Sequence, residues 1–166
     1  MGLLNARELF MIIIDSAIRN AARALIVQGG RILLLRKEGG GAGERYALPG
    51  GAQEPGETLQ QALKRECAEE IGVEVTIRDL VHVADYFKPR DTDPPSTRQL
   101  VEFLFACDVP ADYQARNGHR PDKHQVEVVW ADLEKLSAMR LLPRSLAGYL
   151  QPSGSEAPGT YLGTLD

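Results

Sequence analysis

The sequence predicts a single domain of the α/β class, and two observations support this fold class. Segments rich in Val, Ile and Leu flank Gly29-Gly30, which is a two-residue signal for a β-hairpin. A clear helical pattern follows over residues 58–71, and further strand and helix patterns come after it. The chain of 166 residues is long enough for one hydrophobic core and short for two.

The first strands are separated by glycine-rich segments. Residues 24–28 and 31–36 are the expected strands of the hairpin, and residues 39–43 form a flexible loop. Residues 46–48 are a short strand that leads into Pro49-Gly50-Gly51. These elements bring a glycine pair to the start of the segment that precedes the helix.

The helix over residues 58–71 has a start signal, an apolar stripe and an end signal. Thr58 and Gln61 form a capping box, in which each side chain bonds the backbone amide of the other residue. Gly72 follows at the position where a left-handed residue commonly ends a helix. The stripe has helical spacing and consists of Leu59, Ala62, Leu63, Cys67 and Ile71.

The second half of the chain alternates strand patterns with polar stretches. Strands are expected at residues 73–87 (with a break), 100–109 and 126–130. Residues 88–97 and 110–123 are expected to be long loops, and loops of that length in a compact domain usually serve binding. A helix near residues 133–139 and another opened by Pro143 close a domain predicted over residues 20–150.

The two ends of the chain carry weaker patterns. Residues 1–19 are apolar with scattered charge and could form a helix, a strand or a dimerisation element, which leaves a homodimer open. Residues 151–166 are rich in Gly, Pro and Ser, which predicts a loose tail.

Composition narrows the class of partner. The formal net charge is −4 and the basic residues form no run, which argues against a long nucleic acid but allows a small anionic nucleotide. The apolar run at residues 9–14 ends at Asp15 and is too short for a signal peptide or a membrane span. Cys67 and Cys107 fit buried apolar positions better than a disulfide. A cytoplasmic protein without membrane contact is therefore the default expectation.

Three glutamates on the predicted helix indicate metal chemistry. At about 100° per residue, Glu69 and Glu70 lie about 60° and 40° to either side of Glu66. Glu66 and Glu70 form a like-charge i,i+4 pair, which destabilises an isolated helix by about 0.2–0.5 kcal/mol. A hard cation would remove that cost, because Mg²⁺ prefers oxygen ligands and shares its shell with substrate phosphates. The alternative is a solvated acidic helix face.

The segment over residues 51–73 resembles the Nudix box. In that motif a glycine is followed after five residues by a glutamate, and after seven more by Arg-Glu, an apolar residue, any residue, Glu-Glu, any residue, Gly and an apolar residue. Every fixed position is met here. Residues 46–50 and 127–133 are also similar to the segments that precede the box and close the domain in the family, so the resemblance spans about residues 20–150.

The resemblance implies an α/β/α sandwich around a mixed β-sheet. It also implies that Glu66, Glu69 and Glu70 bind Mg²⁺, with Mn²⁺ as a substitute and the Gly50 carbonyl as a further ligand. Arg65 belongs to the catalytic set together with Glu69 and Glu70. Its part is to pair with Glu57, which orients the box.

The implied reaction is attack of a metal-activated water on one phosphorus of a diphosphate. The general base in the family is a glutamate of the box or an acid on a distant loop. Glu69 and Glu70 are the first choices for this role, and Asp122 and Glu127 are held in reserve.

Three further residues are candidates for substrate binding. Arg36 ends a strand before the glycine loop and could meet a phosphate, or it could be an exposed charge. Glu102 alternates with Leu100 and Leu104, so it faces either a polar pocket or solvent. Glu127 is a possible substrate contact or a surface strand residue.

The substrate is the least constrained part of the function. The two long loops carry Lys88, Arg90, Arg116 and Arg120, and their size favours an NDP-linked compound such as ADP-ribose or a nucleotide sugar. A (d)NTP pyrophosphatase of the house-cleaning type is the alternative. A non-catalytic nucleotide sensor is a third hypothesis, which the intact box argues against.

Overall fold

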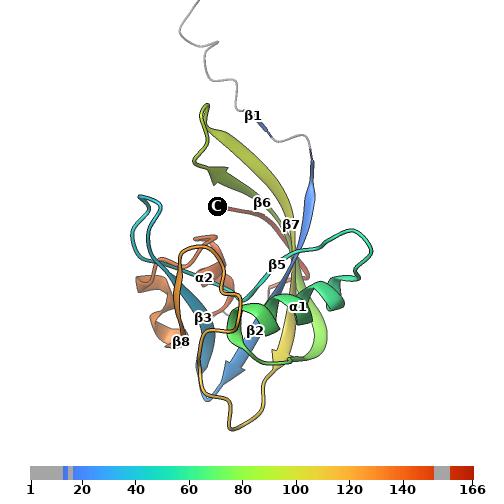
Figure 1. Cartoon of the computed structure of the whole chain (residues 1–166), viewed down its shortest axis with the longest axis vertical. Coiled ribbons are helices and arrows are strands. Elements are labelled where there is room, and N and C mark those ends of the chain that lie inside the picture. The colour runs from blue at the N-terminus through green and yellow to red at the C-terminus, as the bar shows by residue number, and fades with distance from the viewer. Residues whose placement is uncertain (1–12, 15–16, 152–157) are drawn as a thin grey trace, which may run out of the picture.

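The computed structural model describes residues 13–14, 17–151 and 158–166, and a mixed sheet forms its centre (Figure 1). The strands are β1 (Ile13–Ile14), β2 (Arg19–Gln28), β3 (Arg31–Lys37), β4 (Arg45–Ala47), β5 (Gly50–Ala52), β6 (Thr76–Arg90), β7 (Ser96–Asp108), β8 (Gln125–Asp132) and β9 (Tyr161–Leu165). Within the described residues their order is β4-β3-β2-β7-β6-β9, with β1 beside β7, β5 beside β2 and β8 beside β3.

The predicted hairpin at Gly29-Gly30 is confirmed. Both glycines have positive φ, +56° and +74°, as a two-residue turn of type I′ requires. β2 then pairs antiparallel with β3 and β5 and parallel with β7. The strand therefore lies at the point where the sheet changes from antiparallel to parallel pairing.

The predicted helix is α1 (Leu59–Ile71), and its boundaries follow the sequence signals. Thr58 is the N-cap and both hydrogen bonds of the capping box with Gln61 are present. Gly72 ends the helix with φ +66° in the left-handed region. The start and end of the element that carries the three glutamates are thus set by local chemistry.

The sheet divides the hydrophobic core of the domain into two clusters, one on each face. Leu33 and Leu35 of β3 pack toward α1, whereas Ile32 and Leu34 pack on the other face, where η1 (Leu133–Ala138) and α2 (Leu146–Tyr149) lie. A strand buried on both faces reads as a continuous apolar run, as β3 does. This arrangement confirms the predicted α/β fold with helices on both sides of a mixed sheet (Figure 1).

The expected loop over residues 88–97 is wrong in extent. β6 continues to Arg90 and β7 begins at Ser96, so only residues 91–95 make the connection. Lys88 pairs with Arg98 and Arg90 with Ser96 across this ribbon. Backbone pairing with a partner strand stabilises the extended form whether or not the side chains are apolar. The break expected near the start of β6 is present as register shifts between Ile77 and His82.

The expected loose tail is also wrong where the structure describes it. β9 pairs parallel with β6, and Leu162 and Leu165 are buried. Two apolar residues and an open strand edge outweigh the polar composition of this segment. Residues 152–157 lie outside the described part of the chain.

The remaining elements differ in small ways from expectation. The helix expected near residues 133–139 is the 3₁₀ helix η1, and the helix expected to open at Pro143 begins at Leu146. Of the segment 1–19, β1 and the start of β2 are strands, and residues 1–12 and 15–16 lie outside the description. In the part of the chain that is described, no helix is long and apolar enough to cross a membrane.

Candidate active site

Two glycines bring the backbone of β5 directly against β2 and α1. A Cβ atom on Gly50 would lie 2.1 Å from the carbonyl oxygen of Ala22, and Gly50 has φ +125°. A Cβ atom on Gly51 would lie 2.5 Å from the carboxyl group of Glu66. Gly50 admits no side chain, because an added carbon would collide with backbone, and at Gly51 an added carbon would displace the Glu66 carboxylate.

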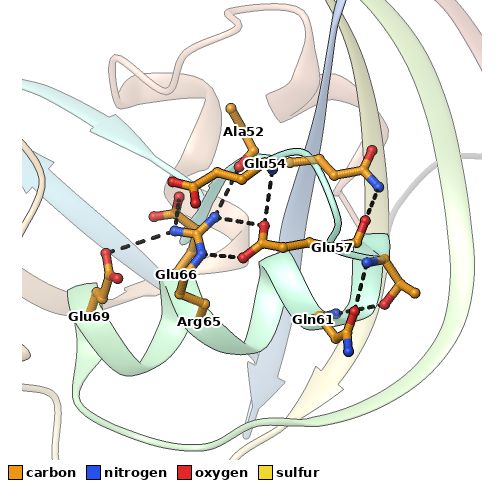
Figure 2. Close-up of polar contacts among 9 residues, drawn as sticks. Ala52, Glu54, Glu57, Gln61, Arg65, Glu66 and Glu69 are labelled. Carbon is orange, nitrogen blue, oxygen red and sulfur yellow. Dashed lines mark hydrogen bonds and ion pairs between the residues drawn. The ribbon is translucent and has the colours of Figure 1, made fainter.

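Arg65 ties the loop before the helix to the carboxylates on the helix (Figure 2). Its Nε lies 2.6 Å from Glu57 Oε1 and its NH2 nitrogen 3.1 Å from Glu57 Oε2. Its NH1 group donates to Glu66 Oε1 at 2.9 Å and lies 3.9 Å from Glu69 Oε2. NH2 also donates to the carbonyl oxygen of Ala52. One guanidinium thus connects β5, the loop and α1.

The same contacts set the ionisation of this pair. The hydrogen bond from Arg65 and, to a smaller extent, that from the Glu54 amide lower the pKa of Glu57 to about 2. Glu57 in turn raises the pKa of Arg65 by accepting its hydrogen bond. Both groups are charged at neutral pH. The expected Glu57–Arg65 contact is therefore present, while its orienting role stays a proposal.

The three box glutamates occupy different environments. Glu66 and Glu69 are 18% and 19% exposed and both lie near Arg65. Glu70 is buried, and its Oε2 accepts a hydrogen bond of 2.8 Å from the Gly50 amide. Burial raises the pKa of Glu70 to about 8, although the Gly50 amide and Arg23 act in the opposite direction. A nearby cation would favour the charged form of Glu70.

These residues suit a hard divalent cation by their chemistry. All three side chains offer oxygen, and the glycine backbone leaves space beside the Glu66 carboxylate that a Cβ atom would fill. Among the described residues, no three Asp, Glu, His or Cys side chains are placed so that together they could hold a metal ion. The Gly50 carbonyl, also expected to bind metal, accepts a hydrogen bond from Arg23. In this arrangement Glu66 accepts a hydrogen bond from Arg65, and Glu69 lies 3.9 Å from the same guanidinium.

Glu102 faces a polar environment and not solvent. It is 3% exposed, and its partner is Arg23 of β2, with Nε to Oε2 at 2.7 Å and NH2 to Oε1 at 3.3 Å. Burial disfavours the charge of Arg23, but Glu102 outweighs this effect and raises the pKa of the guanidinium. Arg23 was not identified from the sequence as a candidate site residue. One pattern indicates it, because Arg23 is the one charged residue in the apolar run from Ala21 to Ile26.

Further charges lie around this pair. Lys37 of β3 forms an ion pair with Asp122, and Lys37 lowers the pKa of Asp122 although burial opposes that effect. Desolvation lowers the pKa of Lys88, and Arg23 and Lys37 lower it further, although the residue is exposed. Asp122, a reserve candidate for the general base, is therefore held by a lysine near the box.

Arg36 and Glu127 contact each other and not the box. They are paired across β3 and β8, and Arg36 Nε lies 2.6 Å from Glu127 Oε1. Arg36 NH1 also contacts Glu38 and Glu44. The expectation that these two residues bind substrate stays a prediction, and Arg36 would have to leave three carboxylates to meet a phosphate.

The loop at residues 110–123 is anchored to the end of α1. Its residues donate to the carbonyl oxygens of successive residues there: Arg120 N to Glu69, Gly118 N to Glu70, and Tyr113 OH to Ile71. A Cβ atom on Gly118 would lie 2.3 Å from the Glu69 carbonyl oxygen. A helix end leaves four carbonyls unpaired, and this loop supplies donors to three of them. It supports the helix and does not form a free lid.

Comparisons with known proteins agree with this geometry. The family profile described as NUDIX domain matches residues 17–150. The "ADP-ribose pyrophosphatase" of Methanocaldococcus jannaschii is 34% identical over 89 residues, which are 54% of this chain and 50% of that protein. The "Oxidized purine nucleoside triphosphate hydrolase" of Danio rerio is 48% identical over 113 residues, 68% of this chain and 65% of that protein. The match therefore spans half of the first relative and less than two thirds of the second.

Solved structures share the fold. The structure described as "MutT protein from Methanosarcina mazei Go1" has a TM-score of 0.61 and 24% identity, covering 80% of this chain and 90% of that one. A "NUDIX hydrolase from Nitrosomonas europaea" has a TM-score of 0.64 and 21% identity, covering 88% and 77%. At these identities the likeness concerns the fold alone.

Proposed function

This chain belongs to the Nudix family, and from that premise we propose that it hydrolyses a phosphoric anhydride bond in a small nucleotide. The observation that carries the proposal is the cluster formed by Arg65 with Glu57, Glu66 and Glu69 beside the glycine pair of β5. Such a cluster holds several like charges close together in a fixed geometry, which a merely solvated helix face does not need.

We propose that Glu66, Glu69 and Glu70 hold Mg²⁺ or Mn²⁺. A divalent cation held by these residues would lower the pKa of a water and neutralise charge on phosphate oxygens. Arg65 keeps Glu66 oriented, and Glu57 keeps Arg65 in place through two hydrogen bonds. Glu70 holds the Gly50 amide, so the backbone that approaches the phosphates is fixed from the helix side.

Glu69 is the side chain proposed to take the proton from water. Its carboxylate is partly exposed, and its nearest cation, Arg65, is 3.9 Å away. Glu70 is the second choice, because its Oε2 is already bonded to the Gly50 amide in a buried position. A base must be able to reach the proton that it accepts, and exposure favours Glu69 over Glu70.

Two substrate classes belong to this proposal, and the structure reverses the order of preference expected from the sequence. The preference for an NDP-linked compound depended on two long loops, but half of the first is strand and the second is anchored to α1. The name of the Danio rerio relative supports a purine nucleoside triphosphate, and that match has the higher identity and coverage. The name of the archaeal relative supports ADP-ribose. We therefore place triphosphates first and NDP-linked compounds second.

Product identification tests both levels of the proposal. The purified protein is incubated with Mg²⁺ and, separately, oxidised and ordinary purine (d)NTPs, ADP-ribose and nucleotide sugars. Inorganic pyrophosphate with a nucleoside monophosphate indicates the first class, and two organic monophosphates indicate the second. The class that contains the substrate with at least tenfold higher kcat/KM is then assigned as the substrate class. Full turnover in excess EDTA, or no turnover of any compound, would overturn the proposed function.

A further inference from the structure

Arg23 occupies a position where a charge is costly. It lies in the middle of β2 between Ala22 and Ala24, both fully buried, and its own side chain is 21% exposed. Removing a guanidinium from water is unfavourable unless good partners compensate, and removing one partner leaves an uncompensated charge. The retained arginine therefore calls for a role that an apolar residue could not fill.

The sheet register explains how Arg23 meets its partners. Ala21 of β2 pairs with Glu102 of β7, so Arg23 is two residues along the same face, within diagonal reach. On its other edge, β2 pairs Arg23 with Gly50 of β5. Two edges of the guanidinium are thereby used: Nε and NH2 contact Glu102, and NH1 donates to the Gly50 carbonyl.

Gly50 has both of its backbone polar groups bonded to buried or partly buried side chains. Its amide donates to Glu70 Oε2, and its carbonyl accepts from Arg23 NH1. In an antiparallel pair, alternate residues direct these groups away from the partner strand, so side chains must satisfy them. A continuous series of contacts results, from Glu102 to Arg23, to Gly50 and to Glu70. It links β7, β2, β5 and α1.

We propose that Arg23 is a positioning residue, which holds the Gly50 backbone and through it the Glu70 carboxylate in the geometry that the reaction needs. This inference rests on the proposed function for its effect on turnover. Glu102 acts only through Arg23, because it fixes the plane of the guanidinium. Lysine cannot replace Arg23, since a single ammonium lacks the planar fork that spans two partners.

The kinetic test compares Arg23→Lys, Arg23→Met and Glu102→Gln with wild type. We expect kcat to fall by about 10- to 100-fold in both Arg23 variants, the range for one hydrogen bond from a charged group, while KM changes little. The double variant Arg23→Met with Glu102→Gln should lose no more than Arg23→Met alone. Arg78→Met is the matched control, because it removes an Arg–carboxylate pair, Arg78–Asp108 at 2.6 Å, elsewhere on the sheet.

A second readout does not depend on turnover. The Gly50 amide, bonded to a carboxylate, is followed by ¹H–¹⁵N NMR, together with its hydrogen-exchange rate. Both Arg23 variants should move this signal and speed its exchange, whereas Arg78→Met should leave it unchanged. Wild type that shows the Gly50 signal but hydrolyses nothing would count against the proposed function alone. Wild-type kcat in Arg23→Met, or an unmoved Gly50 signal in a folded variant, would overturn the positioning role.

Discussion

Arg65 and Arg36 each face three carboxylates, and the two clusters differ chiefly in how exposed those carboxylates are. Around Arg65, the side chains of Glu57, Glu66 and Glu69 are 19%, 18% and 19% exposed. Those around Arg36 are 51%, 54% and 52% exposed, as given for Glu38, Glu44 and Glu127. Solvent screens exposed pairs, which contribute about 0–1 kcal/mol at most. One arginine with three carboxylates therefore forms a more firmly held cluster at Arg65 and a more solvent-screened cluster at Arg36.

The largest difference between the clusters should appear in turnover. Glu69→Gln keeps the shape of the side chain but removes a charge that is proposed to bind metal. We expect kcat to fall by about a hundredfold or more, because several kcal/mol of charge stabilisation are lost. Glu127→Gln is the matched change in the exposed cluster and should keep most of kcat. Equal kcat values for the two variants, measured at saturating substrate and Mg²⁺, would contradict the claim that only the Arg65 cluster serves turnover.

The next effect concerns the contacts that Arg65 makes with Glu57 and Glu66. Arg65→Lys keeps the charge but cannot form the two-point contact with Glu57 while also reaching Glu66. We expect the free energy of unfolding to fall by about 1–3 kcal/mol, as for hydrogen bonds to charged groups, together with a loss of kcat. Urea denaturation measures the first quantity. An unchanged midpoint would mean that the Arg65 cluster is no firmer than the Arg36 cluster.

A smaller effect follows from the pKa of Glu57, which is lowered to about 2. Because the folded value lies below the ordinary value of about 4.3, the pair stabilises the fold fully above that pH. The stabilisation is lost as pH falls from there toward 2. The difference in Tm between wild type and Glu57→Gln should be constant from about pH 5 to 8 and shrink on acidification. A difference that grows at low pH would contradict this sign.

The smallest expected effect belongs to Arg36. Its partners are half exposed, so Arg36→Met should leave the free energy of unfolding nearly unchanged. High salt should reduce even this difference, since screening acts on exposed charges. A change in KM without a change in kcat would show that Arg36 meets the substrate, as its sequence position suggested. Denaturation and steady-state kinetics at low and high salt measure both points.

The parts of the molecule that followed from sequence are those encoded by neighbouring residues. Thr58, Gln61 and Gly72 mark the ends of α1, and the structure places the ends there. The contact between Glu57 and Arg65, which the resemblance to the Nudix box implied, also joins residues of one short segment. For the ends of α1, spacing along the chain was enough to predict the contacts.

The parts that did not follow depend on partners far along the chain. Arg23 and Glu102 are 79 residues apart, and only the register of β2 with β7 brings them together. The polar residues 88–90 are strand because residues 96–98 pair with them. The loop over residues 110–123, which contains Asp122, donates hydrogen bonds to α1, and no local sequence pattern predicted this contact. Long-range pairing decided each of these, and a single sequence carries no direct signal of it.

Strand β9 has a consequence for handling the protein in the laboratory. The family match ends at residue 150, whereas β9 covers the edge of β6 from Val83 to Tyr86. A chain cut at that boundary would expose unpaired backbone groups on β6 together with the cavity left by Leu162 and Leu165. An open strand edge recruits other chains, so such a truncated form should aggregate. The expression boundary should therefore retain residues through Asp166.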